Sequence, residues 1–448
     1  FRAKLTPDNS GLDIEPSFMG NEKNDFNKYS LKEITKKGKE LLDGGNKEFL
    51  EAKIDNEEMS IMLFTSGTTN QSKAVMLSHK NICTNVKDIR NVFELDETDR
   101  LLSFLPLHHT FECTVGFLYP LSIGGSIIFS KGVRHIADEL KNFKITAMIC
   151  VPVVFEKMYD KLMKTIEDKG KMPTVKKGIK LSNCLLKVGI DIRKKLFKEI
   201  HDNLGGCLRV MVAGGAALSP EKEKGFWDLG FNVLQGYGLT ETSPVIAAEL
   251  TKQKRLGSIG KKFPSVEVKI DNPDKSGVGE LLAKGDSVMI GYYNNEEANE
   301  EVFTEDGWFR TGDLARIDKN GYLYISGRKK FVIVLKNGKN VYPEEIESLL
   351  EKSELVKECM VFGMPARDGD VTLSVKICYD KDYVKKQFGD ITIDDLKEKI
   401  WNWVKEVNKT MPKYKYVKKL ILTDEELVKT TTLKIKRNVE MNKIMKSI

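Results

Sequence analysis

Hydroxyl-bearing residues gather around one glycine and one lysine in Phe64–Lys73, whose sequence is FTSGTTNQSK. The apolar run Ile61–Phe64 predicts a strand that leads into this loop. Backbone N–H groups, hydroxyls and a cation together suit a polyphosphate. The spacing differs from the Walker A pattern GxxxxGK[ST], and a Ser/Thr/Gly loop by itself is more often an ordinary turn.

Three later segments carry side chains that suit the rest of a nucleotide. Gln235–Thr242, QGYGLTET, places an aromatic ring that can stack on a purine, a hydroxyl that can bond a phosphate and a carboxylate that can hold Mg²⁺. Gly307–Asp313, GWFRTGD, ends in a carboxylate that can accept hydrogen bonds from two vicinal ribose hydroxyls. Gly327–Lys330, GRKK, is followed by Asn337–Pro343, NGKNVYP.

The elements that position these segments can be read from the apolar pattern. From Ile61 onward, short apolar runs alternate with Gly-rich turns and helical patterns, which predicts α/β layers around a largely parallel sheet. Residues 256–325 read as short strands and turns, which predicts a β-rich subdomain. Pro343 followed by two acidic residues predicts the first turn of a helix.

Length and composition limit the class of protein. The 448 residues suggest two to four domains, and 41% hydrophobic with 31% charged residues excludes collagen-like, low-complexity and wholly disordered chains. The formal charge of +7 is a mild excess that does not mark a nucleic-acid-binding protein. The Lys-rich segment 155–201 is explained by a solvated face, with contact to anionic lipid or cofactor phosphates as the alternative.

The cysteine spacing and the apolar runs indicate in which cellular compartment the protein is expected. Seven scattered cysteines without a CxxC pair predict reduced thiols and a cytoplasmic protein, and five histidines without HExxH predict no transition-metal site. No signal peptide is visible. The longest charge-free run, Cys113–Ser130, contains three glycines and a proline, so we expect buried core pieces and not a spanning helix.

Taken in order, these segments resemble the adenylate-forming (AMP-binding) superfamily of acyl-CoA synthetases, peptide-synthetase adenylation domains and luciferases. The family loop TSGTTGxPKG corresponds to Thr65–Ala74, and YGxTE, TGD and GRxK followed by PxEIE are present. Thr430–Arg437, TTTLKIKR, resembles the C-terminal GKIxR. LPLHHTFE at Leu105–Glu112 and VLKNGKNVYPEEIE at Val334–Glu347 are most similar to the long-chain fatty acyl-CoA synthetases.

This chain also departs from the family pattern. Asn70, Ser72 and Ala74 replace Gly, Pro and Gly of the loop, and Leu433 replaces the glycine before the C-terminal lysine. The segment ahead of the phosphate loop is shorter than in the family. The resemblance implies an AMP-binding domain over residues 1–329, layered α/β with a small β-rich subdomain. It also implies a mobile α+β C-terminal domain over residues 330–448, with the hinge at Lys330.

The resemblance implies a reaction in two halves. ATP and Mg²⁺ convert a long-chain fatty acid to acyl-AMP and pyrophosphate, and coenzyme A then takes the acyl group and releases AMP. Each site residue receives its role from the family: Thr65, Ser66, Gly67, Thr68, Thr69 and Lys73 at the β- and γ-phosphates; Thr240 at the α-phosphate; Glu241 at Mg²⁺; Gly215, Ala216, Ala217, Tyr237 and Gly238 at the adenine; Asp313 and Arg328 at the ribose; Lys434 between the carboxylate and the α-phosphate; His109 near the acyl carboxylate; and Gly338 near the thiol.

Several alternatives stay open at this point. His109 is also explained as a buried structural histidine. The acyl acceptor can be acyl carrier protein, or the acid can be an aryl or medium-chain one. Because the region ahead of the loop is short, a nucleotide-binding protein without turnover is a further alternative. We expect a cytoplasmic protein with no nucleic-acid partner. A peripheral position at an anionic membrane surface is compatible with this expectation, because fatty acids partition into bilayers.

Overall fold

The computed structural model describes residues 2–5, 12–15, 31–65, 73–336, 339–365, 371–429 and 435–447. The chain separates into two compact units, residues 1–56 and 57–448. In the first unit, β1 (Arg2–Leu5) pairs antiparallel with β2 (Leu12–Glu15), and α1 (Leu31–Asp43) follows. All of the elements described below belong to the second unit.

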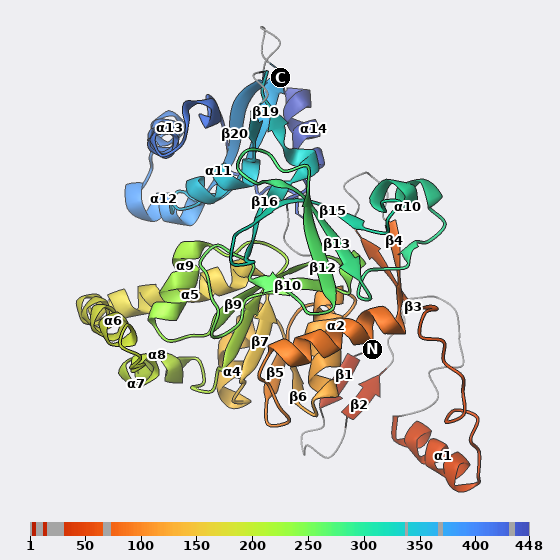
Figure 1. Cartoon of the computed structure of the whole chain (residues 1–448). Coiled ribbons are helices and arrows are strands. Elements are labelled where there is room, and N and C mark those ends of the chain that lie inside the picture. The colour runs from red at the N-terminus through yellow and green to blue at the C-terminus, as the bar shows by residue number, and fades with distance from the viewer. Residues whose placement is uncertain are drawn as a thin grey trace. The chain divides into compact units, whose positions relative to one another are not determined.

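A seven-stranded sheet forms the centre of the second unit (Figure 1). Its order is β11-β10-β9-β8-β7-β5-β6, and the five strands from β9 to β6 run parallel. β10 and β11 join as antiparallel strands at one edge. The bounds are β5 (Arg100–Ser103), β6 (Ser126–Phe129), β7 (Ala147–Cys150), β8 (Val210–Ala213), β9 (Val233–Gly238), β10 (Val245–Ala248) and β11 (Lys261–Lys262).

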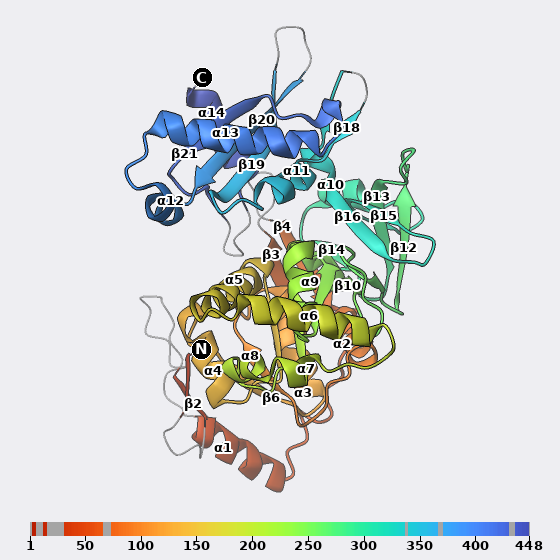
Figure 2. The same cartoon turned by 90° about the vertical axis from the view of Figure 1, so that its left-hand side faces the viewer.

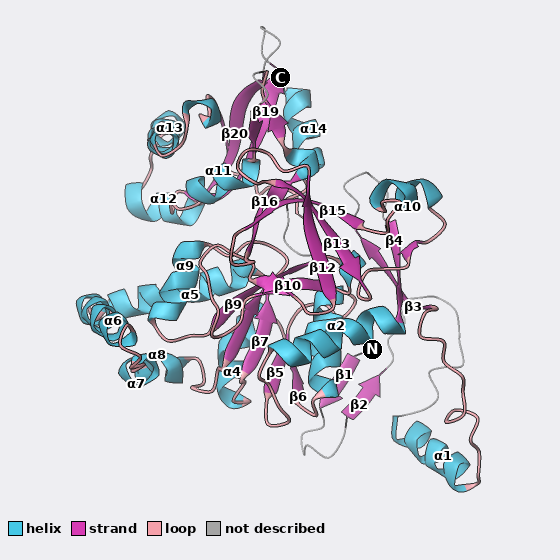
Figure 3. Ribbon diagram, in the orientation of Figure 1, coloured by secondary structure: helices cyan, strands magenta, loops and turns pink. Residues whose placement is uncertain are grey.

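Helices cover both faces of this sheet, which explains why the inner strands β7 and β8 are apolar at every position (Figure 3). Met211 of β8 belongs to the core that contains Phe155 of α5, whereas its neighbour Val212 belongs to the core that contains Ile89 of α2. The helices on the α2 side are α2 (His79–Val92), the π-helix η2 (Glu112–Leu118) and α3 (Tyr119–Ser122). Those on the α5 side include α4 (Ile136–Asn142), α5 (Pro152–Asp168), α6 (Met172–Leu186), α7 (Arg193–Leu196), α8 (Lys198–Asn203) and α9 (Pro220–Asp228).

Two smaller sheets confirm the predicted β-rich region. Four antiparallel strands run in the order β12 (Val266–Asp271), β13 (Gly279–Gly285), β15 (Phe309–Ile317) and β16 (Leu323–Arg328). A three-stranded sheet joins β14 (Gly291–Tyr292) to the hairpin of β4 (Lys73–Ser78) and β3 (Met59–Thr65), and α10 (Glu296–Val302) follows β14. The α/β fold with its β-rich part is therefore as predicted.

The last part of the chain has its own core. α11 (Pro343–Leu350) begins at Pro343, as predicted, with Glu344 and Glu345 in its first turn. The three-stranded sheet pairs β19 (Val356–Pro365) antiparallel and β21 (Lys419–Thr423) parallel with β20 (Val371–Tyr379). The remaining elements are β17 (Ile333–Val334), β18 (Asn340–Val341), α12 (Lys381–Phe388), α13 (Ile393–Lys409) and α14 (Arg437–Ser447). The α+β character is confirmed, and the division after residue 329 stays a prediction.

The charge-free run Cys113–Ser130 forms most of η2, then α3 and all of β6. Among the described residues, no helix combines the length and apolar character that crossing a membrane requires. All seven cysteines lie in the described ranges and are unpaired thiols.

Candidate functional site

The carboxyl ends of β8 and β9 bring the predicted adenine residues together. The register pairs Ala213 with Gln235, so the turn 214–217 after β8 lies beside the end of β9. Gly215 in this turn has φ +83°, a conformation that favours glycine. At Gly238 a Cβ would lie 1.8 Å from the Pro244 carbonyl oxygen, so only glycine fits where β9 meets β10.

Tyr237, Asp313 and Arg328 form one hydrogen-bonded cluster, although they lie on three strands of two sheets. The Tyr237 hydroxyl donates to Asp313 Oδ2 over 2.7 Å, and Arg328 Nε donates to Asp313 Oδ1 over 2.7 Å. Asp313 and Arg328 are direct partners in the β15–β16 register. Burial and the Asp313 charge hold the pKa of Tyr237 well above its usual value, so the phenol remains a donor.

This cluster suits a ribose. Asp313 is only 4% exposed, so an ionised carboxylate here needs strong hydrogen-bond donors. An ionised carboxylate offers about four lone-pair positions, so two protein donors leave capacity for a diol. The sequence correctly predicted that Asp313 and Arg328 belong together, while the contact from Tyr237 comes only from the meeting of two sheets.

A second cluster lies directly after β9 in the chain. Thr240 and Glu241 lie in the 3₁₀ turn η4 (Thr240–Thr242). Tyr292 donates from its hydroxyl to Glu241 Oε1 over 2.9 Å, and the Tyr292 ring has Lys73 Nζ 4.8 Å from its centroid. Lys73 pairs with Thr65 in the β3–β4 register, so both ends of the predicted phosphate loop are anchored here. Sequence reasoning missed Tyr292, because only the pairing of β14 with β4 brings it to this position.

The donor set at Glu241 fits Mg²⁺. Magnesium is usually held by one or two carboxylates and takes its other ligands from phosphates and water. Within the described ranges, no group of three or more His, Cys, Asp or Glu residues could form a protein-only metal cage. Glu241 is partly exposed, and one of its oxygens is oriented by Tyr292, so the carboxylate can reach a metal bound to phosphate.

His109 lies in a turn just before the π-helix η2, where its Nδ1 accepts from the Phe111 backbone N–H over 3.3 Å. The Phe111 ring packs against Gly214, since a Cβ on that glycine would lie 2.7 Å from the ring. The segment that carries His109 therefore lies next to the adenine turn.

Glu112, the last residue of the LPLHHTFE segment, is fully buried. Its Oε2 accepts from the Leu105 backbone N–H over 3.2 Å, and burial raises its pKa to about 7. The Glu112 carboxyl group therefore fixes the turn that carries His109. The sequence offered one signal for this role, a lone acid within an apolar segment.

Six predicted site residues lie outside the described residues: Ser66, Gly67, Thr68, Thr69, Gly338 and Lys434. The described residues that flank Lys434 are firmly held. Lys429 and Ile435 form an antiparallel bridge, Lys429 Nζ lies 2.6 Å from Glu358 Oε2, and Arg437 pairs with Glu347 of α11.

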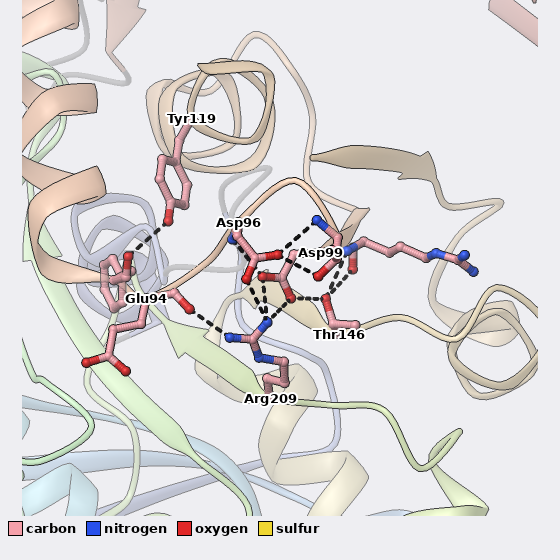
Figure 4. Close-up of polar contacts among 9 residues, drawn as sticks. Glu94, Asp96, Asp99, Tyr119, Thr146 and Arg209 are labelled. Atoms are coloured by element: carbon pink, nitrogen blue, oxygen red, sulfur yellow. Dashed lines mark hydrogen bonds and ion pairs between the residues drawn. The ribbon is translucent and has the colours of Figure 1, made fainter. Parts of the chain in front are cut away.

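A group of hydrogen-bonded side chains, which we call the polar clamp, lies at the amino-terminal ends of the parallel strands (Figure 4). This end of the large sheet is opposite to the two clusters described above. Asp99, Thr146 and Arg209 each lie directly before a parallel strand. Buried Asp99 accepts from Thr146 Oγ1 over 2.6 Å and from Arg209 Nη1 over 2.9 Å, and Arg209 Nη2 donates to the Glu94 carbonyl over 2.9 Å (Figure 4). Because these side chains bond to one another and fill the amino-terminal end of the sheet, we expect a ligand to bind at the carboxyl ends of the strands.

Two family models match the chain. The model of the AMP-binding enzyme matches residues 13–293, and that of the AMP-binding enzyme C-terminal domain matches residues 330–448. The chain belongs to the AMP-binding enzyme family. This confirms the resemblance that the ordered motifs indicated.

Similar curated proteins carry fatty-acid ligase names. Long-chain-fatty-acid–CoA ligase FadD15 of Mycobacterium bovis is 30% identical over 432 residues, which cover 89% of this chain and 70% of that protein. Long-chain-fatty-acid–CoA ligase ACSBG2 of Gallus gallus is 31% identical over 376 residues, 78% of this chain and 49% of that protein. The long-chain-fatty-acid–[acyl-carrier-protein] ligase AEE15 of Arabidopsis thaliana is 26% identical and covers 94% of this chain and 66% of that protein. This chain thus spans from about half to 70% of these relatives.

Among solved structures, ATP-bound MatB from Rhodopseudomonas palustris matches with a TM-score of 0.69 at 26% identity. The match covers 88% of this chain and 69% of that one. The fold of an adenylate-forming enzyme is therefore present in this polypeptide.

Proposed function

We propose that this protein activates a long-chain fatty acid with ATP to acyl-AMP and pyrophosphate, and then transfers the acyl group to coenzyme A. The observation that carries the proposal is that two clusters of side chains lie at the carboxyl ends of the strands of the large sheet. Tyr237, Asp313 and Arg328 form the first cluster, and Glu241 with Lys73 forms the second. The first suits a nucleoside and the second a metal-bound polyphosphate. The names of the relatives supply the acid and the acceptor.

In the first half-reaction, the protein's task is to position two anions and to stabilise charge at the α-phosphate. Asp313 and Arg328 would hold the ribose, Tyr237 would cover the adenine, and Lys73 would contact the phosphates. Glu241 would hold Mg²⁺, which neutralises phosphate charge when it is bound. A carboxylate is a poor electrophile because oxide is a poor leaving group, and AMP is a better one.

The acyl chain requires an apolar site. Between the helices η2 and α3 and the large sheet, Val115 and Tyr119 face Leu101, Ile149 and Val212 across a void of about 10 Å³, which has room for about one water and not for an acyl chain. We propose that the acyl carboxylate lies near His109. Each methylene that an apolar acyl site buries contributes up to about 0.8 kcal/mol, which favours long chains over short ones.

The second half-reaction needs a different arrangement of the C-terminal domain. In the proposed mechanism Lys434 bridges the carboxylate and the α-phosphate, then moves away as the domain rotates about Lys330 and brings Gly338 toward the thiol. Lys330 lies in the 3₁₀ turn η5 (Lys329–Phe331) between β16 and β17, where a small change of backbone angles would move the whole domain.

The proposal also names the molecule that accepts the acyl group. One relative is named as a ligase of acyl carrier protein, so this acceptor is the alternative to coenzyme A. Incubating the protein with ATP, Mg²⁺ and palmitate, with each acceptor in parallel, separates the two. We expect acyl-CoA as the main product, and exclusive acylation of the carrier protein would replace coenzyme A in the proposal.

Pyrophosphate release tests the reaction itself. We expect release that depends on the fatty acid and rises with chain length from acetate to palmitate. ATP binding without any acid-dependent pyrophosphate would support a nucleotide-binding protein without turnover, and a preference for acetate or an aryl acid would overturn the long-chain assignment. The proposed location is the cytoplasm, which the unpaired cysteines support.

A further inference from the structure

One outer face of the helical layer is strongly basic. Residues 172–190, which comprise α6 and the start of the connection to α7, contain four lysines and no aspartate or glutamate. The lysines are Lys176, Lys177, Lys180 and Lys187, and all four are exposed. Figure 2 shows α6 on the outside of the helices that cover the large sheet. We call these four lysines, together with Leu181 and Val188, the α6 face.

The spacing along α6 places the α6 face on one side of the helix. The opposite side is anchored, since Val175 and Ser182 are buried. At the border of the α6 face, Asn183 donates to Asp228 of α9 over 2.9 Å. Leu181 is 55% exposed and Val188 is 71% exposed, and both lie among the lysines. The α6 face therefore combines cationic and apolar side chains on a helix whose other side is held by the fold.

The charge of the α6 face is not neutralised by its surroundings. Among the carboxylates near it, Asp191 pairs with Arg193 at 2.7 Å, Glu199 with Lys171 at 2.6 Å, and Asp228 with Lys224 at 2.6 Å. No carboxylate in the described ranges forms an ion pair with the four lysines of the α6 face.

We propose that the α6 face docks reversibly on an anionic lipid surface. Lysines flanking exposed aliphatic side chains fit such a surface, because the ammonium groups contact lipid phosphates while the aliphatic groups enter the headgroup boundary. Nucleic acid fits less well, since residues 172–190 contain no aromatic side chain on which a base could stack. The inference stands apart from the proposed reaction, but it would place the enzyme where long-chain fatty acids partition.

Vesicle binding without ATP or fatty acid tests the docking by itself. The probes are phosphatidylcholine vesicles with and without phosphatidylglycerol, at low and at high salt. We expect binding only with phosphatidylglycerol and weaker binding at high salt. Replacing the four lysines with Gln should weaken binding about fivefold per lysine, on the order of several hundred-fold in total.

The matched control removes the same charge elsewhere. Lys385, Lys386, Lys397 and Lys405 are exposed on α12 and α13, and their replacement with Gln should change binding little. Leu181→Ser with Val188→Ser should weaken the binding that persists at high salt. An unchanged thermal midpoint, and unchanged pyrophosphate release with a water-soluble acid, would show that each variant is folded.

Three outcomes would overturn the proposal: equal binding to both kinds of vesicle, an equal loss in the control variant, or full binding by the α6 variant. Loss of vesicle binding with intact turnover would support docking, and intact docking without any turnover would refute only the proposed reaction.

Discussion

Tyr292→Phe tests whether the contact between Tyr292 and Glu241 prepares the metal site. The substitution removes only the hydroxyl that donates to Glu241 Oε1 over 2.9 Å. Tyr292 is 5% exposed, so Phe keeps the packing, and its ring can still lie against Lys73. The change therefore isolates the orientation of one carboxylate.

The magnitude follows from the role of a group that orients a metal ligand. Loss of such a partner typically costs 10- to 100-fold in metal affinity, so we expect the Mg²⁺ concentration for half-maximal pyrophosphate release to rise at least ~10-fold. The rate at saturating Mg²⁺ should recover to near the parent value, because Glu241 itself remains. The loss of one hydrogen bond to a charged group should lower stability by only about 1.5–3 kcal/mol, which leaves the protein folded.

The assay is a Mg²⁺ titration of pyrophosphate release in the parent, Tyr292→Phe and Tyr293→Phe. Tyr293 is the matched control, since it is the next residue, carries the same group and is 50% exposed. An unchanged or lower Mg²⁺ requirement in Tyr292→Phe would refute the reasoning, because the hydroxyl would then compete with the metal and not orient its ligand. An equal shift in Tyr293→Phe would show that the effect is not specific.

Four further predictions concern single residues. Glu241→Gln keeps the volume but removes the charge at the metal site, so pyrophosphate release should fall ~100-fold or more, and parent-like activity would place Mg²⁺ elsewhere. Lys434→Ala should slow adenylation ~100- to 1000-fold yet convert supplied acyl-AMP and coenzyme A at near-parent rate, and equal slowing of both half-reactions would contradict the domain rotation. Asp99→Ala leaves Arg209 and Thr146 without their shared acceptor. In chemical denaturation, this substitution should lower the free energy of unfolding by about 3 kcal/mol. A loss below about 1 kcal/mol would mean that the clamp contributes no more than an exposed ion pair. Burial raises the pKa of Glu112 from 4.5 to about 7, so its contribution to stability is complete below pH 4.5 and is lost as pH rises to 7. Glu112→Gln should remove this decline in the free energy of unfolding, which amounts to up to about 3 kcal/mol. If the free energies of unfolding of both proteins, measured by denaturation, fall in parallel with pH, the assignment is contradicted.

Local signals in the sequence predicted much of the fold. Val210–Ala213 is apolar at every position because helices cover both faces of β8, and that pattern needs no knowledge of the helices. Pro343 begins α11 because its fixed φ and missing N–H suit the first helical turn. The ordered motifs likewise placed Tyr237, Asp313 and Arg328 in one nucleotide site before any distance between them was known.

Contacts between distant segments could not be predicted in this way. Tyr292 belongs to no recognisable motif, and it reaches Glu241 only because β14 pairs with β4 across 215 positions of the chain, from Met76 to Gly291. The pKa of Glu112 depends on how completely η2 and its neighbours exclude water, which no local pattern reports. The sequence showed the α6 lysines as a charged segment. It could not show whether nearby carboxylates neutralise them, because that depends on which residues those carboxylates pair with in the fold.

The sequence by itself therefore determined the family, and it predicted the nucleotide-binding residues, because both depend on residue type and spacing along the chain. The tertiary structure decided which side chains orient the metal carboxylate, which acid is buried and which end of the sheet is closed. Those features depend on sheet pairing and desolvation, and both arise only when segments far apart in the chain pack together.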